Sequence, residues 1–402
     1  MIKIDILYFG NFCDEKLHLK DEKENKSPYR MAQYNYEKAF LDEMSNINDV
    51  DIISLYQQEN FPKNELYFHR KSFRKYKIKI SYIPYINLPF IKEALFFINT
   101  CFKIIKWNNN SKDNERCIFS NIHYAPVSLA VVVMGKLLNI KKVITFTDLS
   151  LYTYSKEKQK NMVWYKKMVI RPYITLVNRL QQSYDLYILF SKEMNNIVNP
   201  FNKPFIVMEG IYNKDELNFD KVKREKAIAY AGKLNKEVGV NKILEVFSKI
   251  KDQDLELWLL GSGDMEKDII QASKKDKRIK FLGFKTRKEV FEYLKKAKVL
   301  VNLRNPKLEY TKYSFPSKTF EYMVSGTPFV TTKLDGIPKE YERYIFFTDY
   351  DNENIIKEIE KILKMNEEEI KIIGNNAREF VINNKSAEKQ VEVINKFLRN
   401  NI

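Results

Sequence analysis

The sequence predicts an α/β protein built from two doubly wound domains. Short apolar segments of strand length alternate with longer segments of helical period, and this alternation runs through both halves of the chain. Such alternation is typical of parallel sheets that are covered by helices on both faces. The chain has 402 residues, which is enough for two domains that each bury a core.

In the first half, four short apolar segments predict strands, at residues 4–9, 117–120, 142–146 and 186–190. Three segments carry apolar residues at helical spacing and predict helices, at residues 30–44, 130–138 and 164–181. We expect residues 1–200 to form this domain. Residues 201–226 are polar and contain Pro204 and Gly210, so we expect them to link the two halves.

In the second half, five strands are predicted, at residues 227–231, 255–260, 279–282, 299–303 and 328–331. Helices are predicted at residues 241–250, 265–274, 287–296, 316–324 and 354–365. We expect residues 227–385 to form the second domain and residues 387–399 to form a final helix. Sheets of this kind bind ligands at the carboxyl ends of their strands, and a nucleotide is the first expectation.

The composition excludes several classes of protein. Three cysteines are too few for a disulfide framework, and no two of them stand close enough to suggest a zinc site. The longest apolar stretch, residues 82–102, contains charged residues and does not predict a membrane span. We therefore expect a cytoplasmic protein, either free or peripheral at the inner face of the cell membrane.

The basic residues are concentrated in one part of the chain. The formal net charge is +17, and residues 51–200 hold 23 basic against 10 acidic residues. Two basic runs, at residues 63–79 and 156–171, are interleaved with aromatic residues. This combination favours an anionic membrane surface, although the phosphates of nucleic acid attract the same charges. An ordinary solvated face is the third interpretation.

One segment combines a strand, a polar loop and a helix start in a pattern that predicts a phosphate site. A buried strand ends near Arg304, and Pro316 is placed to be the first residue of a helix that stops at Gly326. The backbone N–H groups of Ser317 and Lys318 would then point out of the helix N-terminus, where the helix dipole and the lysine favour an anion.

Glu321 lies one helical turn further on, where it could accept hydrogen bonds from a ribose diol of the same ligand. An ordinary helix start with a solvated glutamate explains the same spacing. The sequence contains no Gly-x-x-x-x-Gly-Lys-Ser/Thr phosphate loop and no Gly-x-Ser-x-Gly elbow. Gly261-Ser262-Gly263 lacks the third glycine of a dinucleotide fingerprint, because Glu266 stands in its place, and it predicts only a tight turn.

The segment from residue 304 to residue 328 closely resembles the donor-site signature of retaining nucleotide-sugar glycosyltransferases of the GT-B fold, family four, also called glycosyl transferases group 1. It is most similar to capsule and exopolysaccharide members, which carry Tyr-Ser-Phe-Pro-Ser-Lys (here 313–318) and Glu-Tyr-Met (here 321–323). Further segments resemble the family at residues 27–44, 144–149, 229–234, 281–284 and 333–341. The resemblance implies two Rossmann-like domains that face each other across a cleft. It also implies that residues 386–402 cross back to the first domain.

The resemblance implies roles for individual residues. Catalytic or phosphate-binding roles fall on Asp148, Lys233, Arg304 and Lys318. Donor-binding roles fall on Gly232, Phe284, Glu309, Tyr313, Ser314, Phe315, Ser317 and Glu321. Acceptor-side roles fall on Gly10, Tyr29, Arg30 and His123.

The reaction implied by the resemblance is sugar transfer from a nucleoside diphosphate sugar with retention at the anomeric carbon. It needs no metal, no cofactor and no protein nucleophile, and a UDP-sugar is favoured over a GDP-sugar. The transferred group would be a hexosyl or N-acetylhexosaminyl group, and the acceptor a saccharide or a polyprenyl-diphosphate-linked saccharide. The implied setting is the synthesis of a bacterial surface polysaccharide, such as capsule, exopolysaccharide or O-antigen. Nucleic acid is not expected as a partner, because it leaves the signature unexplained.

Three positions depart from the pattern of the family. Tyr313 stands eight residues before Glu321, where many members carry a first glutamate, and Glu309 could replace it. Val238 stands where a second phosphate-binding cation is usual, and Thr147 stands where a histidine is common. These departures keep open a second function, that of a catalytically silent GT-B subunit that binds without transferring.

Overall fold

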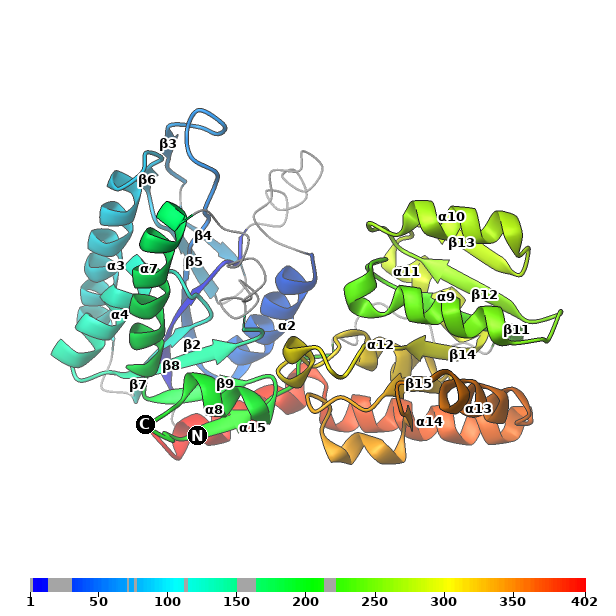
Figure 1. Cartoon of the computed structure of the whole chain (residues 1–402). Helices are drawn as coiled ribbons and strands as arrows, with labels where there is room; N and C mark the ends of the chain where they lie inside the picture. Colours follow the sequence, from blue (N-terminus) through cyan, green and yellow to red (C-terminus); the bar gives the residue numbers. More distant parts are fainter. Residues whose placement is uncertain are drawn as a thin grey trace. The chain divides into compact units, whose positions relative to one another are not determined.

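The computed structural model describes residues 3–13, 31–70, 72–75, 78–111, 115–149, 164–212 and 222–402. The chain forms two compact units, each of which contains a mainly parallel sheet (Figure 1). Unit 1 comprises residues 1–211 together with 387–402, and unit 2 comprises residues 212–386. The C-terminal helix therefore belongs to unit 1.

The sheet of unit 1 has eight strands in the order β10-β9-β8-β7-β1-β2-β5-β4. Its strands are β1 (Asp5–Gly10), β2 (Asp49–Ser54), β4 (Phe73–Lys75), β5 (Ile78–Tyr82), β7 (Arg116–Ser120), β8 (Lys141–Phe146), β9 (Leu186–Leu189) and β10 (Phe205–Val207). Neighbouring strands pair in parallel, except that the edge strand β4 is antiparallel to β5. A separate antiparallel pair joins β3 (Tyr67–Phe68) to β6 (Tyr85–Ile86).

The helices of unit 1 are α2 (Met31–Ile47), α3 (Ile91–Asn110), α4 (Ala125–Leu137), α7 (Trp164–Gln182), η1 (Lys192–Met194), α8 (Asn195–Val198) and α15 (Ala387–Arg399). Helix α4 packs against both α3 and α7, and α15 packs against α2. The α15 contact includes a hydrogen bond of 2.9 Å from Asn48 Nδ2 to Asn395 Oδ1. None of the described helices combines the length and apolarity that a membrane crossing requires.

The predicted strands and helices of unit 1 are present, but strands β2 to β6 and helices α3 and α8 were not predicted. Helix α3 escapes detection because both of its faces carry apolar residues, and Phe96, Ile104 and Trp107 form most of the buried one. Lys92 and Thr100 lie on its buried face, whereas Ile98 and Phe102 are exposed. Strand β10 lies within residues 201–226, which were expected to be a linker, and it pairs with β9.

The sheet of unit 2 has six parallel strands in the order β13-β12-β11-β14-β15-β16. These are β11 (Glu225–Ala231), β12 (Glu256–Leu260), β13 (Ile279–Gly283), β14 (Ala297–Asn302), β15 (Phe329–Thr332) and β16 (Phe346–Thr348). The helices are α9 (Val240–Lys249), α10 (Glu266–Lys275), α11 (Arg287–Lys296), α12 (Lys318–Ser325), α13 (Asn352–Leu363) and α14 (Glu367–Asn384). Short 3-10 turns are η2 (Lys236–Val238), η3 (Glu309–Lys312) and η4 (Lys339–Arg343).

Two apolar cores cover the two faces of this sheet, because successive residues of a strand point to opposite sides. Ala229 and Ala231 of β11 belong to one core, which also includes residues of α11, α12 and α14. Ile228 and Tyr230 belong to the other, which includes residues of α9, α10 and α13. The predicted doubly wound architecture is thus confirmed for unit 2, although α14 and β16 were not predicted.

In both sheets the direction of strand progression reverses between two neighbouring strands. The reversal lies between β7 and β1 in unit 1, and between β11 and β14 in unit 2. Open α/β sheets bind ligands outside the carboxyl ends of the strands at such points. The topology therefore indicates one candidate site in each unit.

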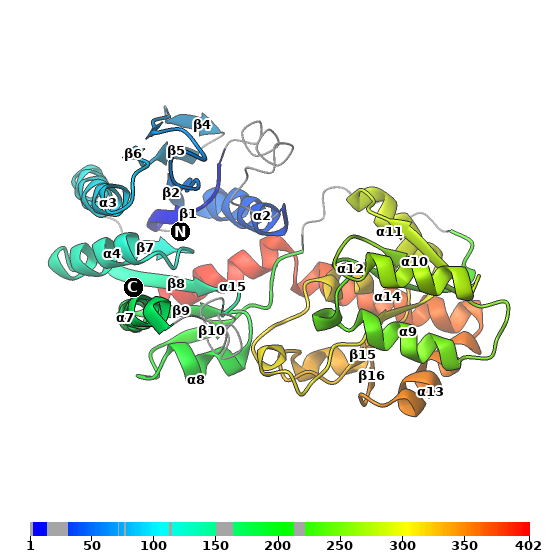
Figure 2. The same ribbon diagram turned by 45° about the horizontal axis from the view of Figure 1, so that its top comes forward.

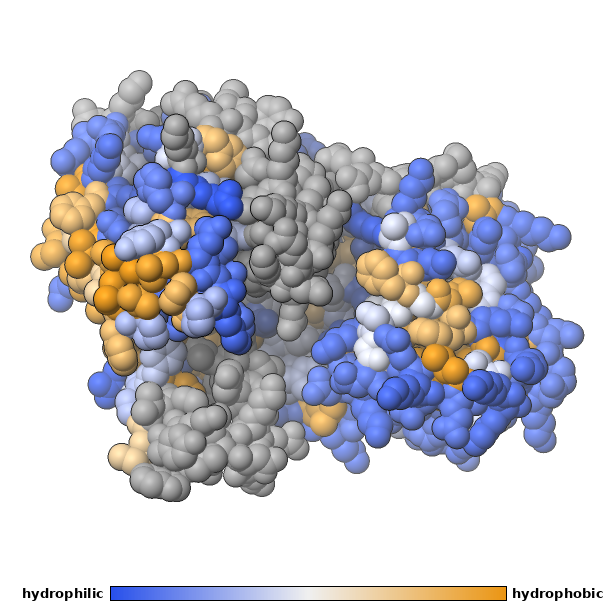
Figure 3. Space-filling model, turned by 90° about the horizontal axis from the view of Figure 1, so that it is seen from above, coloured by the Kyte–Doolittle hydropathy of each residue, from blue (hydrophilic) through white to orange (hydrophobic). Residues whose placement is uncertain are grey.

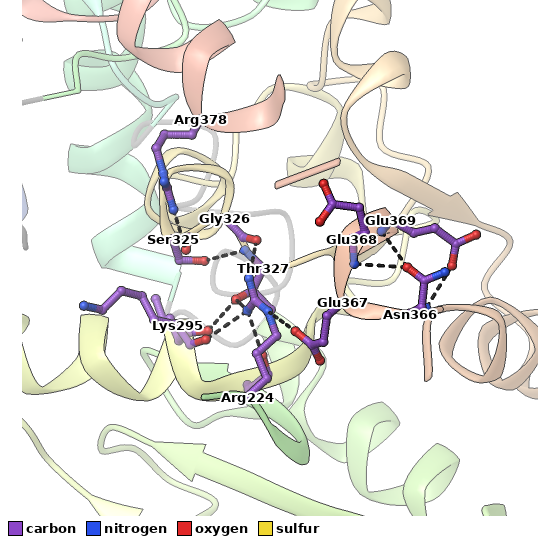
Figure 4. A network of polar contacts seen from close by, with 12 residues as sticks. Arg224, Lys295, Ser325, Gly326, Thr327, Asn366, Glu367, Glu368, Glu369 and Arg378 are labelled. Atoms are coloured by element: carbon purple, nitrogen blue, oxygen red, sulfur yellow. Dashed lines mark hydrogen bonds and ion pairs between the residues drawn. The ribbon is translucent and has the colours of Figure 1, made fainter. Parts of the chain in front are cut away.

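Two arginines hold the C-terminal end of α12 (Figure 4). Arg378 of α14 donates hydrogen bonds to the carbonyls of Val324 (2.8 Å) and Ser325 (3.1 Å). Arg224 donates to the carbonyl of Gly326 at 2.8 Å and to Thr327 Oγ1 at 2.6 Å. Cations at this end of a helix satisfy its free carbonyls and oppose its dipole. The network fixes the helix whose other end carries the predicted phosphate site.

We expect Arg378→Met to lower the free energy of unfolding of unit 2 by about 2–3 kcal/mol, because it removes two charge-assisted hydrogen bonds from partly buried carbonyls. Arg378→Lys should recover only part of the loss, since an ammonium cannot reproduce the planar fork of a guanidinium. Urea denaturation measures both effects. Lys371→Met on the exposed side of α14 is the control, and an equal loss in that variant would contradict the assignment.

Candidate active site

The candidate site of unit 2 lies where β11 and β14 end. Gly232 follows β11, and its backbone N–H donates to the carbonyl of Leu260 at 2.9 Å. Arg304 follows β14, and its carbonyl accepts a hydrogen bond of 2.6 Å from Thr332 Oγ1. Helix α12 begins at Lys318, two residues later than predicted, with Ser317 at its N-cap. The structure thus brings Gly232, Arg304 and Lys318 together from three distant parts of the sequence.

Lys318 occupies an unusual environment for a lysine. Its Nζ is buried, has no hydrogen-bond partner among the described residues, and lies 3.6 Å from the centroid of the Tyr230 ring. A Cβ atom placed on Gly232 would lie 2.5 Å from both Cε and Nζ of Lys318. A larger residue at position 232 would displace the ammonium group, and the φ of 134° favours glycine there as well. The ring face of Tyr230 supplies a cation–π contact.

Arg304 adds a second cation beside Lys318. Its Nη1 donates to Ser314 Oγ at 3.3 Å, whereas its Nε is buried and has no partner among the described residues. Burial, reinforced by the nearby Arg304, holds the pKa of Lys318 well below its usual value, and Glu321 opposes this effect. Neither cation forms an ion pair with a carboxylate among the described residues. An anionic ligand at this place would relieve the repulsion between the two cations and satisfy their free N–H groups.

Glu321 forms an ion pair with a residue that was not predicted to belong to the site. Arg287, the first residue of α11, donates from Nε to Glu321 Oε1 at 3.2 Å, and both side chains are about one third exposed. An exposed pair of this kind contributes little to stability. It does orient the carboxylate, so Arg287 joins the candidate site, and only its position at the start of a predicted helix could have suggested it.

The remaining predicted donor residues differ in exposure. Lys233, Glu309 and Ser317 are exposed, as is Phe284, whose side chain is 79% accessible. Such side chains are free to meet a ligand. Tyr313 and Ser314 are partly buried in the loop before α12.

Phe315 plays a structural part, because its side chain is only 8% exposed. It packs in the core with ring centroids 5.1 Å from Phe320 and 5.4 Å from Tyr341. Its packing fixes the loop that precedes α12, and any contact with a ligand falls to its backbone.

Two buried polar residues near the same edge were not predicted. Asn302 ends β14 with both side-chain polar atoms unpartnered among the described residues, and Thr319 Oγ1 is in the same condition. Both residues are fully buried. Unpaired buried polar groups cost stability, and in native proteins they mark functional positions or bound water. The signal in the sequence is an asparagine that closes an otherwise apolar strand.

In unit 1, three predicted residues lie at the carboxyl ends of neighbouring strands. Gly10 ends β1, His123 follows β7, and Asp148 follows β8 in an exposed position. His123 Nδ1 lies 2.9 Å from Gln181 Nε2, and burial lowers the pKa of His123 to about 4. The ring is therefore neutral at pH 7. Tyr29 and Arg30 lie outside the described residues.

A glutamate that was not predicted lies at the reversal point of the first sheet. Glu37 of α2 is 1% exposed and accepts hydrogen bonds from Asn11 N–H at 3.0 Å and from Asn121 Nδ2 at 2.6 Å. These partners follow β1 and β7, the two strands between which the order reverses. Burial raises the pKa of Glu37 to about 7, because desolvation outweighs the hydrogen bonds that favour the carboxylate.

We expect Glu37 to make stability fall as pH rises. Between the ordinary pKa of 4.5 and the folded value of about 7, the folded protein holds a proton that the unfolded chain has lost. Over this window the difference in unfolding free energy between wild type and Glu37→Gln should change by about 3 kcal/mol, to the disadvantage of wild type. Urea denaturation across this pH range measures it, with the exposed Glu115→Gln as control. A pH-independent difference would contradict the expectation.

Among the described residues, no group of three or more His, Cys, Asp or Glu side chains is arranged to hold a metal ion. The groups that the structure does gather in unit 2 are two cations, a glycine turn and a carboxylate oriented by Arg287. This arrangement suits a phosphorylated ligand that also carries hydroxyl groups.

One family model matches most of unit 2. Residues 213–380 match the family model described as Glycosyl transferases group 1. No curated protein sequence matches the chain significantly.

Solved structures resemble the whole chain at low sequence identity. Sucrose-phosphate synthase from Thermosynechococcus elongatus is 14% identical with a TM-score of 0.60, over 99% of this chain and 98% of that one. Anabaena HepE, solved with UDP-glucose, is 12% identical with a TM-score of 0.62, over 98% and 99%. OtsA is 9% identical with a TM-score of 0.62, over 99% of both chains. The chain thus has the two Rossmann-like halves of the GT-B fold, and residues 213–380 carry the match to the Glycosyl transferases group 1 family.

Proposed function

We propose that this protein is a glycosyltransferase that moves a sugar from a nucleoside diphosphate sugar to a saccharide or lipid-linked saccharide. The proposal rests on two cations. Arg304 lies in the loop before α12, and Lys318 is the first residue of α12. Arg304 and Lys318 have buried, unpartnered N–H groups and no carboxylate partner among the described residues. A diphosphate supplies the negative charge that both lack, and the match of residues 213–380 supports the same reaction class.

The positions of Lys318 and Arg304 support this reaction. As the bond between sugar and diphosphate breaks, negative charge grows on the leaving phosphate. Lys318, Arg304 and the first N–H groups of α12 stabilise that charge, and preorganised groups of this kind are commonly the largest contribution to catalysis. The leaving phosphate can itself take the proton of the acceptor hydroxyl, so the reaction requires no protein nucleophile.

The finer terms of the proposal are a UDP-sugar donor, hexosyl or N-acetylhexosaminyl transfer with retention, and no metal requirement. Anabaena HepE has been solved with UDP and with UDP-glucose, so uracil is the base bound by that protein. A trehalose-6-phosphate synthase structure with a TM-score of 0.63 is described as an enzyme of glycosyl transfer with retention. We extend both properties to this chain, and place its acceptor in surface polysaccharide synthesis at the inner face of the cell membrane.

Calorimetric titration of the protein with UDP and GDP tests the donor site. We expect UDP to bind more tightly than GDP, and Arg304→Met to abolish binding, whereas the exposed Lys307→Met in the same loop should leave it intact. Donors that bind are then incubated with saccharide acceptors, and proton NMR of the product reports the anomeric configuration. A folded protein that binds neither nucleotide would overturn the proposal.

A silent binding subunit is the second candidate function. The three departures from the family pattern, Tyr313, Val238 and Thr147, favour it. Nucleotide binding without transfer or donor hydrolysis would establish this function, and turnover would exclude it.

A further inference from the structure

Helix α3 of unit 1 presents an apolar stripe to solvent. Ile91, Ile98, Phe102 and Ile105 recur at helical spacing along its outer face, and Phe102 is 66% exposed. Phe90, the residue before the helix, is 87% exposed. The outer face of a surface helix is normally polar, so this stripe requires an explanation.

The neighbouring helices continue the apolar surface. Leu129, Val133 and Leu137 are exposed on α4, and Met168, Tyr173 and Leu176 are exposed on α7. Because α4 packs between α3 and α7, these residues lie on three adjacent helices (Figure 2). Apolar residues gather on the surface of unit 1 at the left of Figure 3. We call these exposed apolar residues of α3, α4 and α7, together with Phe90, the apolar face. Contiguous apolar surface of this kind marks an interaction site.

The charges on the same helices are positive with one exception. Lys103, Lys106, Lys136, Arg171 and Arg179 carry positive charge at positions that are partly or fully exposed, and none is paired with a carboxylate among the described residues. Helices α4 and α7 contain no acidic residue. The one acidic residue of α3, Glu93, accepts a hydrogen bond of 3.1 Å from Tyr124 Oη.

The basic residues cluster as well. Desolvation lowers the pKa of Lys103, and the positive charges of Lys106 and of Lys79 on β5 add to this effect. Lys79 belongs to the first basic run of the sequence. The side chains of residues 74–77 and 156–167 in the two runs lie outside the described residues.

The charges decide between possible occupants of the apolar face. In a symmetric dimer the same patch meets itself, so the basic residues of two copies would face one another with no acid to pair them. A bilayer with anionic headgroups offers the matching combination, since apolar and aromatic side chains enter the headgroup boundary while lysines and arginines bind phosphate.

We infer that the apolar face of α3, α4 and α7 is the surface by which this protein docks on an anionic lipid bilayer. The inference rests on the proposed function in one respect, because a lipid-linked acceptor is the reason for this enzyme to bind a bilayer. The evidence for it comes from unit 1 alone and uses no residue of the donor site.

Vesicle sedimentation of the full-length protein tests the inference, with vesicles of phosphatidylcholine alone and of phosphatidylcholine mixed with phosphatidylglycerol. Binding should be selective for the mixed vesicles and should weaken with salt. Lys103→Gln with Lys106→Gln should weaken it about fivefold for each charge removed, and Phe102→Glu about tenfold or more. All three positions are partly or fully exposed, so we expect the variants to fold, which circular dichroism checks.

Two matched controls come from unit 2. Ile372→Glu on α14 introduces the same charge at a side chain that is 54% exposed, and Lys274→Gln with Lys275→Gln removes two exposed charges from α10. Neither should change lipid binding. Three results would overturn the inference. They are equal binding to both vesicle types, equal losses of binding in the control variants, and a dimer in light scattering that Phe102→Glu dissociates. UDP calorimetry on the same variants separates the two proposals. A protein that binds vesicles but no nucleotide would support the docking surface and contradict the proposed transferase function.

Discussion

Replacing Lys318 with methionine should remove donor binding and yet leave the protein more stable. The ammonium group is buried without a hydrogen-bond partner among the described residues and lies near the positive charge of Arg304. Removing it should raise the free energy of unfolding by about 1–3 kcal/mol, the cost of an unsatisfied buried donor. Transfer should fall by about 10²- to 10³-fold, because a group that stabilises the departing phosphate is lost.

The pH dependence gives this prediction a second readout. The folded-state pKa of Lys318 lies below its unfolded value, so the unfolded chain binds the extra proton between these two values. The stability of the wild-type protein should therefore rise with pH across that window, and Lys318→Met should lack this rise. Urea denaturation across pH and steady-state kinetics measure the two effects. A variant that is both less stable and fully active would refute the functional assignment of Lys318.

Gly261→Ala should destabilise unit 2 by more than about 4 kcal/mol, a loss that few single substitutions cause. Gly261 has a φ of 131°, and a Cβ atom at this position would lie 1.8 Å from the carbonyl oxygen of Gly232. The backbone of the glycine turn after β11 must then move, and with it the space that Lys318 occupies. We expect UDP binding to be lost together with stability.

Gly283→Ala is the matched control for this substitution. Gly283 also has a positive φ, of 68°, but no atom lies within 4 Å of a Cβ built on it. Its cost should be limited to the backbone conformation, about 1–2 kcal/mol. Urea denaturation and UDP calorimetry compare the two variants, and similar losses in both would show that the contact with Gly232 is not the cause.

Local signals in the sequence indicate the elements around the site of unit 2 but not helix α3 of unit 1. The strand before Arg304 and the helix after Ser317 were predicted to within two residues, because apolar period, Pro316 and Gly326 are local signals. In contrast, α3 was missed because apolar residues lie on both of its faces, with Phe96 and Ile104 buried and Phe102 exposed. The chain there lacks the contrast between a polar and an apolar side that marks a surface helix.

The composition of the site shows the same division. Lys318 was predicted from its place at a helix start, yet nothing local indicates that its Nζ lies over the ring of Tyr230, 88 residues earlier in the chain. Arg287 and Glu37 were missed for a related reason. Each is one charged residue among many in a helix, and only the neighbouring strand or helix makes it part of a site.

The sequence by itself determined the doubly wound α/β class, most strands and helices, and the loop and helix start that carry the phosphate-site signature. These features depend on the period of apolar residues and on turn and capping residues, which act over a few positions. Only the tertiary structure decided which polar groups are desolvated and which hydrogen-bond or ion-pair partners they have. Burial shifts the pKa of Glu37 and of Lys318 and leaves Arg304 Nε without a partner among the described residues, while the packing of α3, α4 and α7 leaves the apolar face of unit 1 exposed. Burial depends on contacts between segments far apart in the chain, and no local pattern contains that information.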